Sequence, residues 1–273
     1  MTGCTYGSWC PANHASAKAV YYLIMTHLLL PLLLMCSFRA FTQDVPALLQ
    51  QATRLESDFK EEDALVQYQQ IVKLQPHKVF ALCRCSDLSC RIGNWQDSRD
   101  QKIAYFKAGR GYADAAWRLD STNSEANVVM AFSIGRMILL ESGKEKVAGA
   151  GAIKRYAENA IRHDPENYKA WHILGRWQYE VSGLNFIERT LAKWFYGALP
   201  DASLQESIRD YEKSMSLRPG FMLNYLELAK ACHRDGQNAR AIQLLRRLDS
   251  LKDGMYDDRQ VRREGRQLLA EWQ

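Results

Sequence analysis

The sequence predicts an all-α fold: a right-handed solenoid of about five stacked helical hairpins, closed by a C-terminal capping helix. Two observations support this prediction. Small and apolar residues recur at helical spacing between Ala52 and Leu248, and the runs end at turn-forming steps such as Gln75-Pro76 and Asp164-Pro165. A hairpin that repeats at a fixed spacing forms a stack, because each unit buries the apolar side of its neighbour.

The first hairpin shows the pattern most clearly. Its apolar positions lie three or four residues apart, at Ala52 and Leu55, and then at Ala64, Tyr68 and Ile71. Residues at these separations share one side of a helix, so the segment predicts two amphipathic helices joined by a short turn. Pro76 ends the second helix, since proline is excluded from helix interiors.

The second and third hairpins are expected to be less regular. We predict a helix over residues 79–92, ending at Gly93-Asn94, and a longer helix from Trp95 towards Leu119. The third hairpin pairs residues 125–140 with 152–161. Gly149 and Gly151 are interpreted as the start of its second helix, because no strand precedes them as a dinucleotide-binding loop requires.

The last two hairpins return to the regular pattern. Their apolar and small positions are Trp171, Leu174, Gly175 and Tyr211 in the fourth, and Tyr225, Leu228, Ala229, Ala241, Leu245 and Leu248 in the fifth, with Gly236 at the turn. This is the tetratricopeptide pattern, whose period is about 34 residues. Ala52, Gly175 and Ala229 occupy equivalent places, where a small side chain lets two helices approach closely.

A final helix carries both a basic stripe and an apolar one. The basic residues are Arg259, Arg262, Arg263 and Arg266, and the apolar residues are Val261, Leu268, Leu269 and Trp272. Two interpretations are open. The helix caps the solenoid with a polar outer side, or its arginines contact an acidic partner or an anionic membrane.

The composition is that of a globular chain, with 47% hydrophobic and 25% charged residues. The net charge of +5 is too small to indicate a nucleic-acid partner, and we expect none. Outside the leader the cysteines are Cys83, Cys85, Cys90 and Cys232. A zinc site needs four converging ligands, so we interpret them as core residues and expect neither metal nor cofactor. Their disulfide state is left open.

Residues 1–43 form an N-terminal extension with a signal peptide or membrane anchor, and residues 44–273 form the repeat domain. The segment from Ala19 to Phe38 is apolar, follows Lys18 and precedes Arg39. A basic residue, an apolar core and a polar exit are typical of export signals, and the apolar length also suits a membrane span. We therefore expect an exported, periplasmic or membrane-associated protein.

An insertion over residues 183–203 separates the two helices of the fourth hairpin. Phe186, Leu191, Trp194 and Phe195 fall on one side of a short predicted helix. An amphipathic helix has to bury its apolar side. It either folds onto its own solenoid or acts as a lid over a ligand, a partner contact or a membrane contact.

Several segments together resemble the regulator of microtubule dynamics family. They are residues 144–148, residues 153–161 with Asp164-Pro165, residues 171–177, and residues 189–195 ahead of Pro200. The resemblance covers about residues 48–269. It implies a tetratricopeptide-like domain without known catalytic residues, association with microtubules, spindle poles and mitochondria, and phospholipid binding in one member. The leader suggests a bacterial-type exported member. Without a signal, the resemblance implies a cytoplasmic, mitochondrial or microtubule-associated location.

The function predicted from these features is a non-enzymatic scaffold for a protein or peptide in a concave groove. Arg176, Tyr179, Lys230 and Arg234 are the candidate groove residues, because first helices of repeats line such grooves. His172 and His233 are interpreted as structural. Two alternatives are lipid or amphiphile binding in an apolar cavity closed by the insertion, and a microtubule-associated role by resemblance, with tubulin as the partner. The partner's identity and the oligomeric state are left open.

Overall fold

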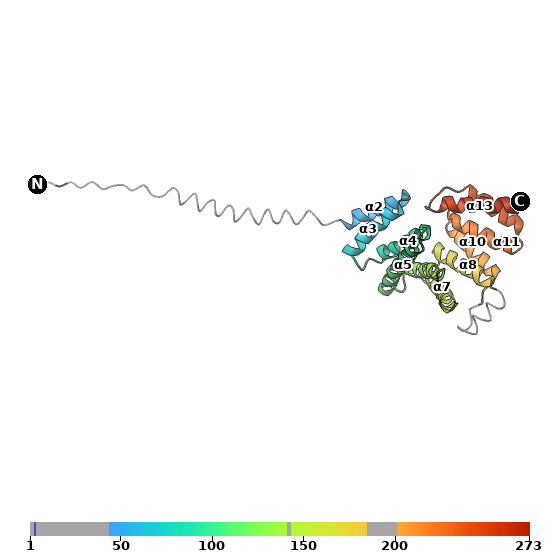
Figure 1. Cartoon of the computed structure of the whole chain (residues 1–273), viewed down its shortest axis with the longest axis horizontal. Helices are drawn as coiled ribbons and strands as arrows, with labels where there is room; N and C mark the ends of the chain where they lie inside the picture. Colours follow the sequence, from blue (N-terminus) through green and yellow to red (C-terminus); the bar gives the residue numbers. More distant parts are fainter. Residues whose placement is uncertain (1–2, 4–43, 141–142, 185–200) are drawn as a thin grey trace. The chain divides into compact units, whose positions relative to one another are not determined.

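The computed structural model describes residue 3 and residues 44–140, 143–184 and 201–273. Residues 45–273 form one compact unit (Figure 1). The described residues contain eleven α-helices and no strand. The helices are α2 (Val45–Ser57), α3 (Glu61–Leu74), α4 (Val79–Trp95), α5 (Arg99–Leu119), α6 (Ser124–Ile138), α7 (Gly143–His163), α8 (Tyr168–Ser182), α10 (Leu204–Leu217), α11 (Met222–Arg234), α12 (Asn238–Asp249) and α13 (Asp258–Trp272).

The helices pack as five hairpins followed by a single helix, which confirms the predicted fold class. The paired helices are α2 with α3, α4 with α5, α6 with α7, α8 with α10, and α11 with α12, while α13 packs on α11 and α12. The order in space follows the order along the chain, as in a solenoid (Figure 1).

The stack has an inner and an outer layer. The first helices of successive hairpins contact one another, from α4 to α6, α6 to α8, α8 to α11 and α11 to α13. Among the described elements, the second helices α5, α7, α10 and α12 make no such contacts with one another. The first helices therefore lie closer together and form the inner layer of the stack.

Polar side chains fix the points where several helices begin. The side chains of Asn123, Asn167 and Ser203 accept hydrogen bonds from backbone N–H groups of the first turns of α6, α8 and α10. These N-caps satisfy donors that a helix leaves free at its start. The turn between α11 and α12 uses Gly236 with φ of 80°, as predicted, whereas the turn after α2 places Phe59 at φ of 58°. Phe59 shows that a bulky residue can occupy this left-handed turn.

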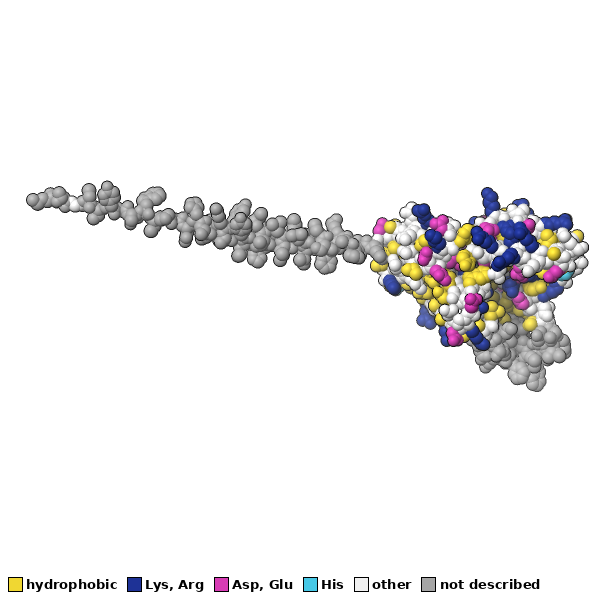
Figure 2. Space-filling model, turned by 45° about the horizontal axis from the view of Figure 1, so that its top comes forward, with side chains coloured by type: hydrophobic (Ala, Val, Ile, Leu, Met, Phe, Trp, Pro, Cys, Tyr) yellow, Lys and Arg dark blue, Asp and Glu magenta, His cyan; other side chains and the backbone are white. Residues whose placement is uncertain are grey.

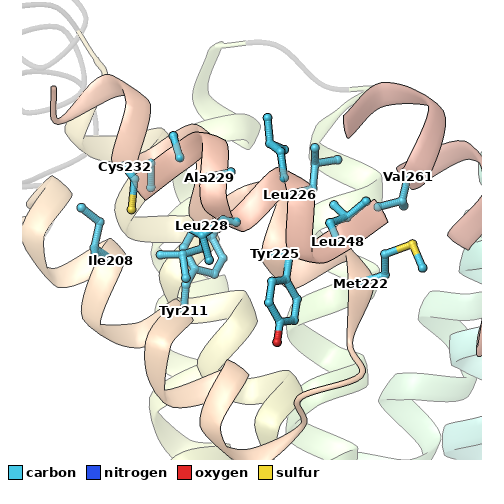
Figure 3. Packing of buried hydrophobic residues seen from close by; sticks show 14 residues of the cluster. Ile208, Tyr211, Met222, Tyr225, Leu226, Leu228, Ala229, Cys232, Leu248 and Val261 are labelled. Carbon is cyan, nitrogen blue, oxygen red and sulfur yellow. The ribbon is translucent and has the colours of Figure 1, made fainter. Parts of the chain in front are cut away.

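The largest apolar core lies in the last two hairpins and the capping helix. Figure 3 shows Tyr211 of α10 close to Leu228 of α11, with Val261 of α13 at the far side of the cluster. Tyr211 is fully buried and packs against Gly175, where an added Cβ would lie 3.0 Å from the ring. Ala52 and Ala229 are also fully buried. The predicted close approach of two helices is therefore confirmed at Gly175.

Two predicted boundaries are wrong, and glycine is the reason in both cases. Helix α4 continues through Gly93 to Trp95, and α5 begins at Arg99. A Cβ on Gly93 would lie 2.8 Å from Phe106, so this glycine permits α4 and α5 to cross closely. Likewise α7 begins at Gly143, and Gly149 lies inside it, where a Cβ would overlap the side chain of Ile138. Both glycines mark helix crossings and do not mark helix ends.

Candidate functional site: the inner face

The inner layer presents a polar surface, which we call the inner face. We define it by the side chains of the first helices that interact across hairpins. They are Glu56 of α2, Arg84, Asp87, Arg91 and Asn94 of α4, Glu125, Phe132 and Arg136 of α6, Lys169, His172, Arg176 and Tyr179 of α8, Glu227, Lys230 and Arg234 of α11, and Glu264 of α13. Space-filling Figure 2 shows basic and acidic side chains interspersed over the visible side of the domain.

The first part of the inner face is an ion-pair network that joins two hairpins. Arg84 binds Glu56 and also lies 2.9 Å from Asp87, while Tyr68 donates a 2.6 Å hydrogen bond to Glu56. Burial alone would raise the pKa of Asp87, but Arg84, Lys169 and Arg91 lower it below its ordinary value. Asp87 is consequently ionised, and it is held by Arg84 of the same chain.

The last part of the inner face is organised around one buried carboxylate. Glu227 is only 4% exposed, and its two oxygens lie 3.1 Å from Arg176 and 3.1 Å from Lys230. Lys230 also lies 2.6 Å from Glu264, which links α8, α11 and α13. Burial alone would lower the pKa of Lys230, but Glu227 and Glu264 raise it. A buried carboxylate is stable only when it is paired in this way.

The structure brings the four predicted groove residues together between α8 and α11. Arg176 and Lys230 share Glu227, and the guanidinium of Arg234 lies 4.1 Å from the centre of the Tyr179 ring. Arg234 also donates a hydrogen bond to Ser182. Half of the Arg176 side chain is exposed. The four residues thus form two contacting pairs on neighbouring helices, and their role in binding remains a prediction.

Both histidines are held by packing. His172 lies between Phe221 and Tyr211, and its Nδ1 is 2.9 Å from Oδ1 of Asn224. The amide of Asn224 donates to the Tyr211 carbonyl, which directs Oδ1 at the imidazole. Burial lowers the pKa of His172, so the ring is neutral at pH 7. His233 stacks on Trp272 at 3.9 Å. These contacts are those of structural residues.

The loop before α13 reaches the second hairpin. The Tyr256 ring lies 5.9 Å from Trp95, beside a cleft of about 240 Å³ that Phe59 and Glu61 also line. Burial raises the pKa of Glu61 to about 7, although Arg91 binds its carboxylate and opposes the shift. The cleft is small beside the roughly 300–1,000 Å³ of typical ligand pockets. We assign it to the contact between the two ends of the stack.

The cysteines are buried in the core, and one of the C-terminal arginines, Arg262, ties α13 to the end of α12. Cys83, Cys85, Cys90 and Cys232 are free and buried, and the described residues contain no group of His, Cys, Asp and Glu arranged for a metal ion. In α13, Arg262 donates to the carbonyl oxygens of Asp249 and Leu251 at the end of α12. Val261 is buried, and Leu268, Leu269 and Trp272 pack on the core. The helix therefore caps the stack, and Arg262 holds it there.

Known proteins identify the family of this chain. A family model described as regulator of microtubule dynamics protein 1-3 matches residues 48–273. The chain belongs to the regulator of microtubule dynamics family. It is 28% identical to regulator of microtubule dynamics protein 3 of Xenopus laevis over 67% of this chain and 39% of that protein. It is 26% identical to protein 1 of Caenorhabditis elegans over 70% of this chain and 83% of that protein.

The chain thus spans less than half the length of the Xenopus relative, and most of the length of the Caenorhabditis relative. Among solved structures, it is similar to a thermophilic TPR protein from Thermus thermophilus, with a TM-score of 0.62 and 10% identity over 83% of this chain and all of that one. At this identity the likeness shows the fold alone, and the fold is the one predicted from the spacing of small and apolar residues.

Two groups of predicted residues lie outside the described part of the chain. Phe186, Leu191, Trp194 and Phe195 fall within residues 185–200, and the leader falls within residues 4–43. Within the described residues, no helix is long and apolar enough to span a membrane. The lid and the leader therefore remain predictions.

Sequence reasoning missed the middle of the inner face. Arg136 of α6 donates a 3.1 Å hydrogen bond to Asn94 of α4, and its guanidinium lies 4.9 Å from the centre of the Phe132 ring. The residues are 42 positions apart in the chain, so no local spacing relates Arg136 to Asn94. The only available signal was that Phe132 and Arg136 stand four residues apart on one predicted helix.

Proposed function

We propose that this domain is a non-enzymatic scaffold whose inner face binds a protein or peptide segment. The observation that carries the proposal is the continuous inner layer of first helices, which presents Arg176, Tyr179, Lys230 and Arg234 side by side. Such a surface can recognise an extended or helical segment by contacts alone. His172 and His233, the two histidines considered for acid–base chemistry, are held by packing.

A peptide-display selection on the purified full chain tests the proposal. Random peptides selected on the wild-type protein are remeasured on Arg176→Glu and on the matched control Arg209→Glu. Both arginines are about half exposed and pair with a glutamate of their own helix, but Arg209 lies on the outer helix α10. Binding to the inner face predicts that Arg176→Glu weakens binding and that Arg209→Glu leaves it unchanged. Equal effects, or no selected peptide, would contradict the proposal.

Because Arg176 also holds Glu227, the fold of each variant has to be checked separately. Circular dichroism and the unfolding midpoint of Arg176→Glu show whether the helices persist. A variant with retained helicity and lost binding supports the proposal. Where the variant unfolds, Tyr179→Ala provides a second test, since its ring faces Arg234 and carries no charge.

The names of the relatives favour a microtubule protein as a second candidate partner. Co-sedimentation of the full chain with polymerised tubulin tests this directly, with the same pair of variants. Binding that Arg176→Glu removes and Arg209→Glu retains would identify tubulin as the ligand of the inner face. A chain that stays in the supernatant at saturating polymer excludes that partner.

The leader and the insertion extend the proposal. We propose that residues 1–43 export the protein or anchor it to a membrane, and that the 183–203 insertion covers a bound segment or an amphiphile. N-terminal sequencing of the mature protein would show whether the residues before Asp44 are removed. Native mass spectrometry of the purified protein would show a bound lipid if the amphiphile alternative holds. Export across a membrane would be incompatible with tubulin as the partner.

A further inference from the structure

Among the described residues, the inner face contains two guanidiniums without a carboxylate partner, those of Arg136 and of the exposed Arg234. The other basic side chains of this surface are neutralised: Arg84 by Glu56 and Asp87, Arg91 by Glu61, Lys169 by Glu125, and Arg176 and Lys230 by Glu227. Arg136 takes part in none of the ion pairs of the described residues. Arg234 contacts the Tyr179 ring, and it is exposed, as is Arg263 of α13, so water solvates both.

Arg136 is also incompletely hydrogen-bonded. Its Nη1 donates to Asn94, but its buried Nε has no hydrogen-bond partner. Burial lowers the pKa of Arg136 and nearby Arg176 acts in the same direction, while Cys90, Asp257 and Asp87 oppose the shift. A guanidinium nevertheless stays charged at neutral pH, because its pKa starts above about 12. The site therefore holds a fixed positive charge with unused donors.

The surroundings determine which anion suits this charge. Phe132 lies beneath the guanidinium and offers an apolar contact at the same place. The neighbouring cations are already paired, and Asp87 and Asp257 lie near enough to affect Arg136. A doubly charged phosphate would need a second free cation, and these carboxylates would repel it more strongly than a singly charged group. A carboxylate carries one charge and fits the planar fork of an arginine through two parallel hydrogen bonds.

We propose that Arg136 is the anchor for a single carboxylate, an Asp or Glu side chain or the C-terminus, of a peptide bound to the inner face. This inference rests on the proposed peptide-binding function and names the chemistry that the ligand requires. Asn94 orients the guanidinium through Nη1, and Phe132 packs against apolar atoms next to the ligand's carboxylate. The carboxylate takes the place of a partner that the described residues do not supply.

The test uses the peptide-display selection on the full chain with three proteins. Wild type and the control Arg263→Gln are expected to select peptides with an enriched acidic position or with a required free C-terminus. Arg136→Gln is expected to select peptides without that preference. For a selected sequence, replacing its acidic residue by the amide should weaken binding to wild type about tenfold, the effect of losing one charged hydrogen-bonded contact. The same replacement should leave binding to Arg136→Gln unchanged.

The possible outcomes separate this inference from the proposed function. Peptides that bind the inner face without any acidic preference would overturn the role of Arg136 and leave the scaffold function intact. Failure of the wild type to select any peptide would overturn both. A preference that persists in Arg136→Gln would place the anion elsewhere and would also refute the inference. Arg136→Lys keeps the charge but loses the fork, so it should restore only part of the preference.

Discussion

The close approach of two helices at Gly175 determines whether Gly175→Ala raises or lowers the free energy of unfolding. In a helix interior, replacing Gly by Ala gains about 1 kcal/mol of helix propensity. At Gly175, however, the new Cβ would lie 3.0–3.2 Å from three atoms of the Tyr211 ring, which is fully buried and cannot move away. Overpacking of a core costs about 1–3 kcal/mol. We therefore expect Gly175→Ala to destabilise the domain by a net amount of about 1 kcal/mol.

Gly111 is the matched control for this substitution. It lies inside α5, it is exposed, and an added Cβ would meet no atom within 4 Å. Gly111→Ala should therefore stabilise the domain by the full gain in helix propensity, about 1 kcal/mol. For a domain of this size 1 kcal/mol moves the unfolding midpoint by about 2–4 °C, so the two variants should shift in opposite directions from wild type. Thermal unfolding followed by circular dichroism measures both. An increase for Gly175→Ala equal to that for Gly111→Ala would refute the packing argument.

Three further predictions concern buried polar groups. Arg136→Met should raise the unfolding midpoint, because it removes an unpaired buried charge and an unsatisfied donor worth about 1–3 kcal/mol; a lower midpoint would show that Arg136 is a structural residue. Burial raises the pKa of Asp210 to about 7, with Glu206 acting in the same direction, so the ionisation of Asp210 destabilises the fold as the pH rises from about 4 to 7. Asp210→Asn should accordingly stabilise the domain more at pH 8 than at pH 5, and equal effects at the two pH values would contradict the assignment. Burial raises the pKa of Cys83, Cys85 and Cys90 to about 12. An alkylating reagent should therefore label these thiols only after the protein unfolds, which mass spectrometry can map. Rapid labelling of the native chain would disagree with their burial.

The fold was predictable because its determinants are local. Spacings of three and four residues define the sides of helices, and Gln75-Pro76, Asp164-Pro165 and Gly236 mark turns that the structure contains at those places. The small residues also gave information about contacts across hairpins, as Gly175 shows. Glycine was misleading at Gly93 and Gly149, because the same residue permits either the end of a helix or the crossing of two helices. Whether a glycine ends a helix or permits a crossing depends on the neighbouring helix, which supplies Phe106 against Gly93 and Ile138 against Gly149.

The candidate site was predictable only in part, because the role of a charged residue on a helix depends on partners that are far away in the sequence. Arg176 and Lys230 were chosen because they lie on first helices, and they do lie together. Their common partner Glu227 is nevertheless buried, which the sequence did not indicate. Arg136 resembles any other helix arginine in the sequence. It becomes distinctive only after every neighbouring cation has been matched with its carboxylate in the folded chain.

The internal ion pairs of the inner face limit where a ligand anion can gain binding energy. A ligand anion that approaches Arg176 or Lys230 competes with Glu227, which is already in place and is only 4% exposed. The gain from such a contact is reduced by the pair that it disturbs. At Arg136 no carboxylate of the described residues has to be displaced, and Phe132 adds an apolar contact. Neutral substitution at Arg136 should therefore weaken the binding of an acidic peptide more than Arg176→Gln does. Isothermal titration with one peptide and both variants, compared at equal helicity, makes this ranking measurable, and the reverse order would place the energetic centre at α8 and α11.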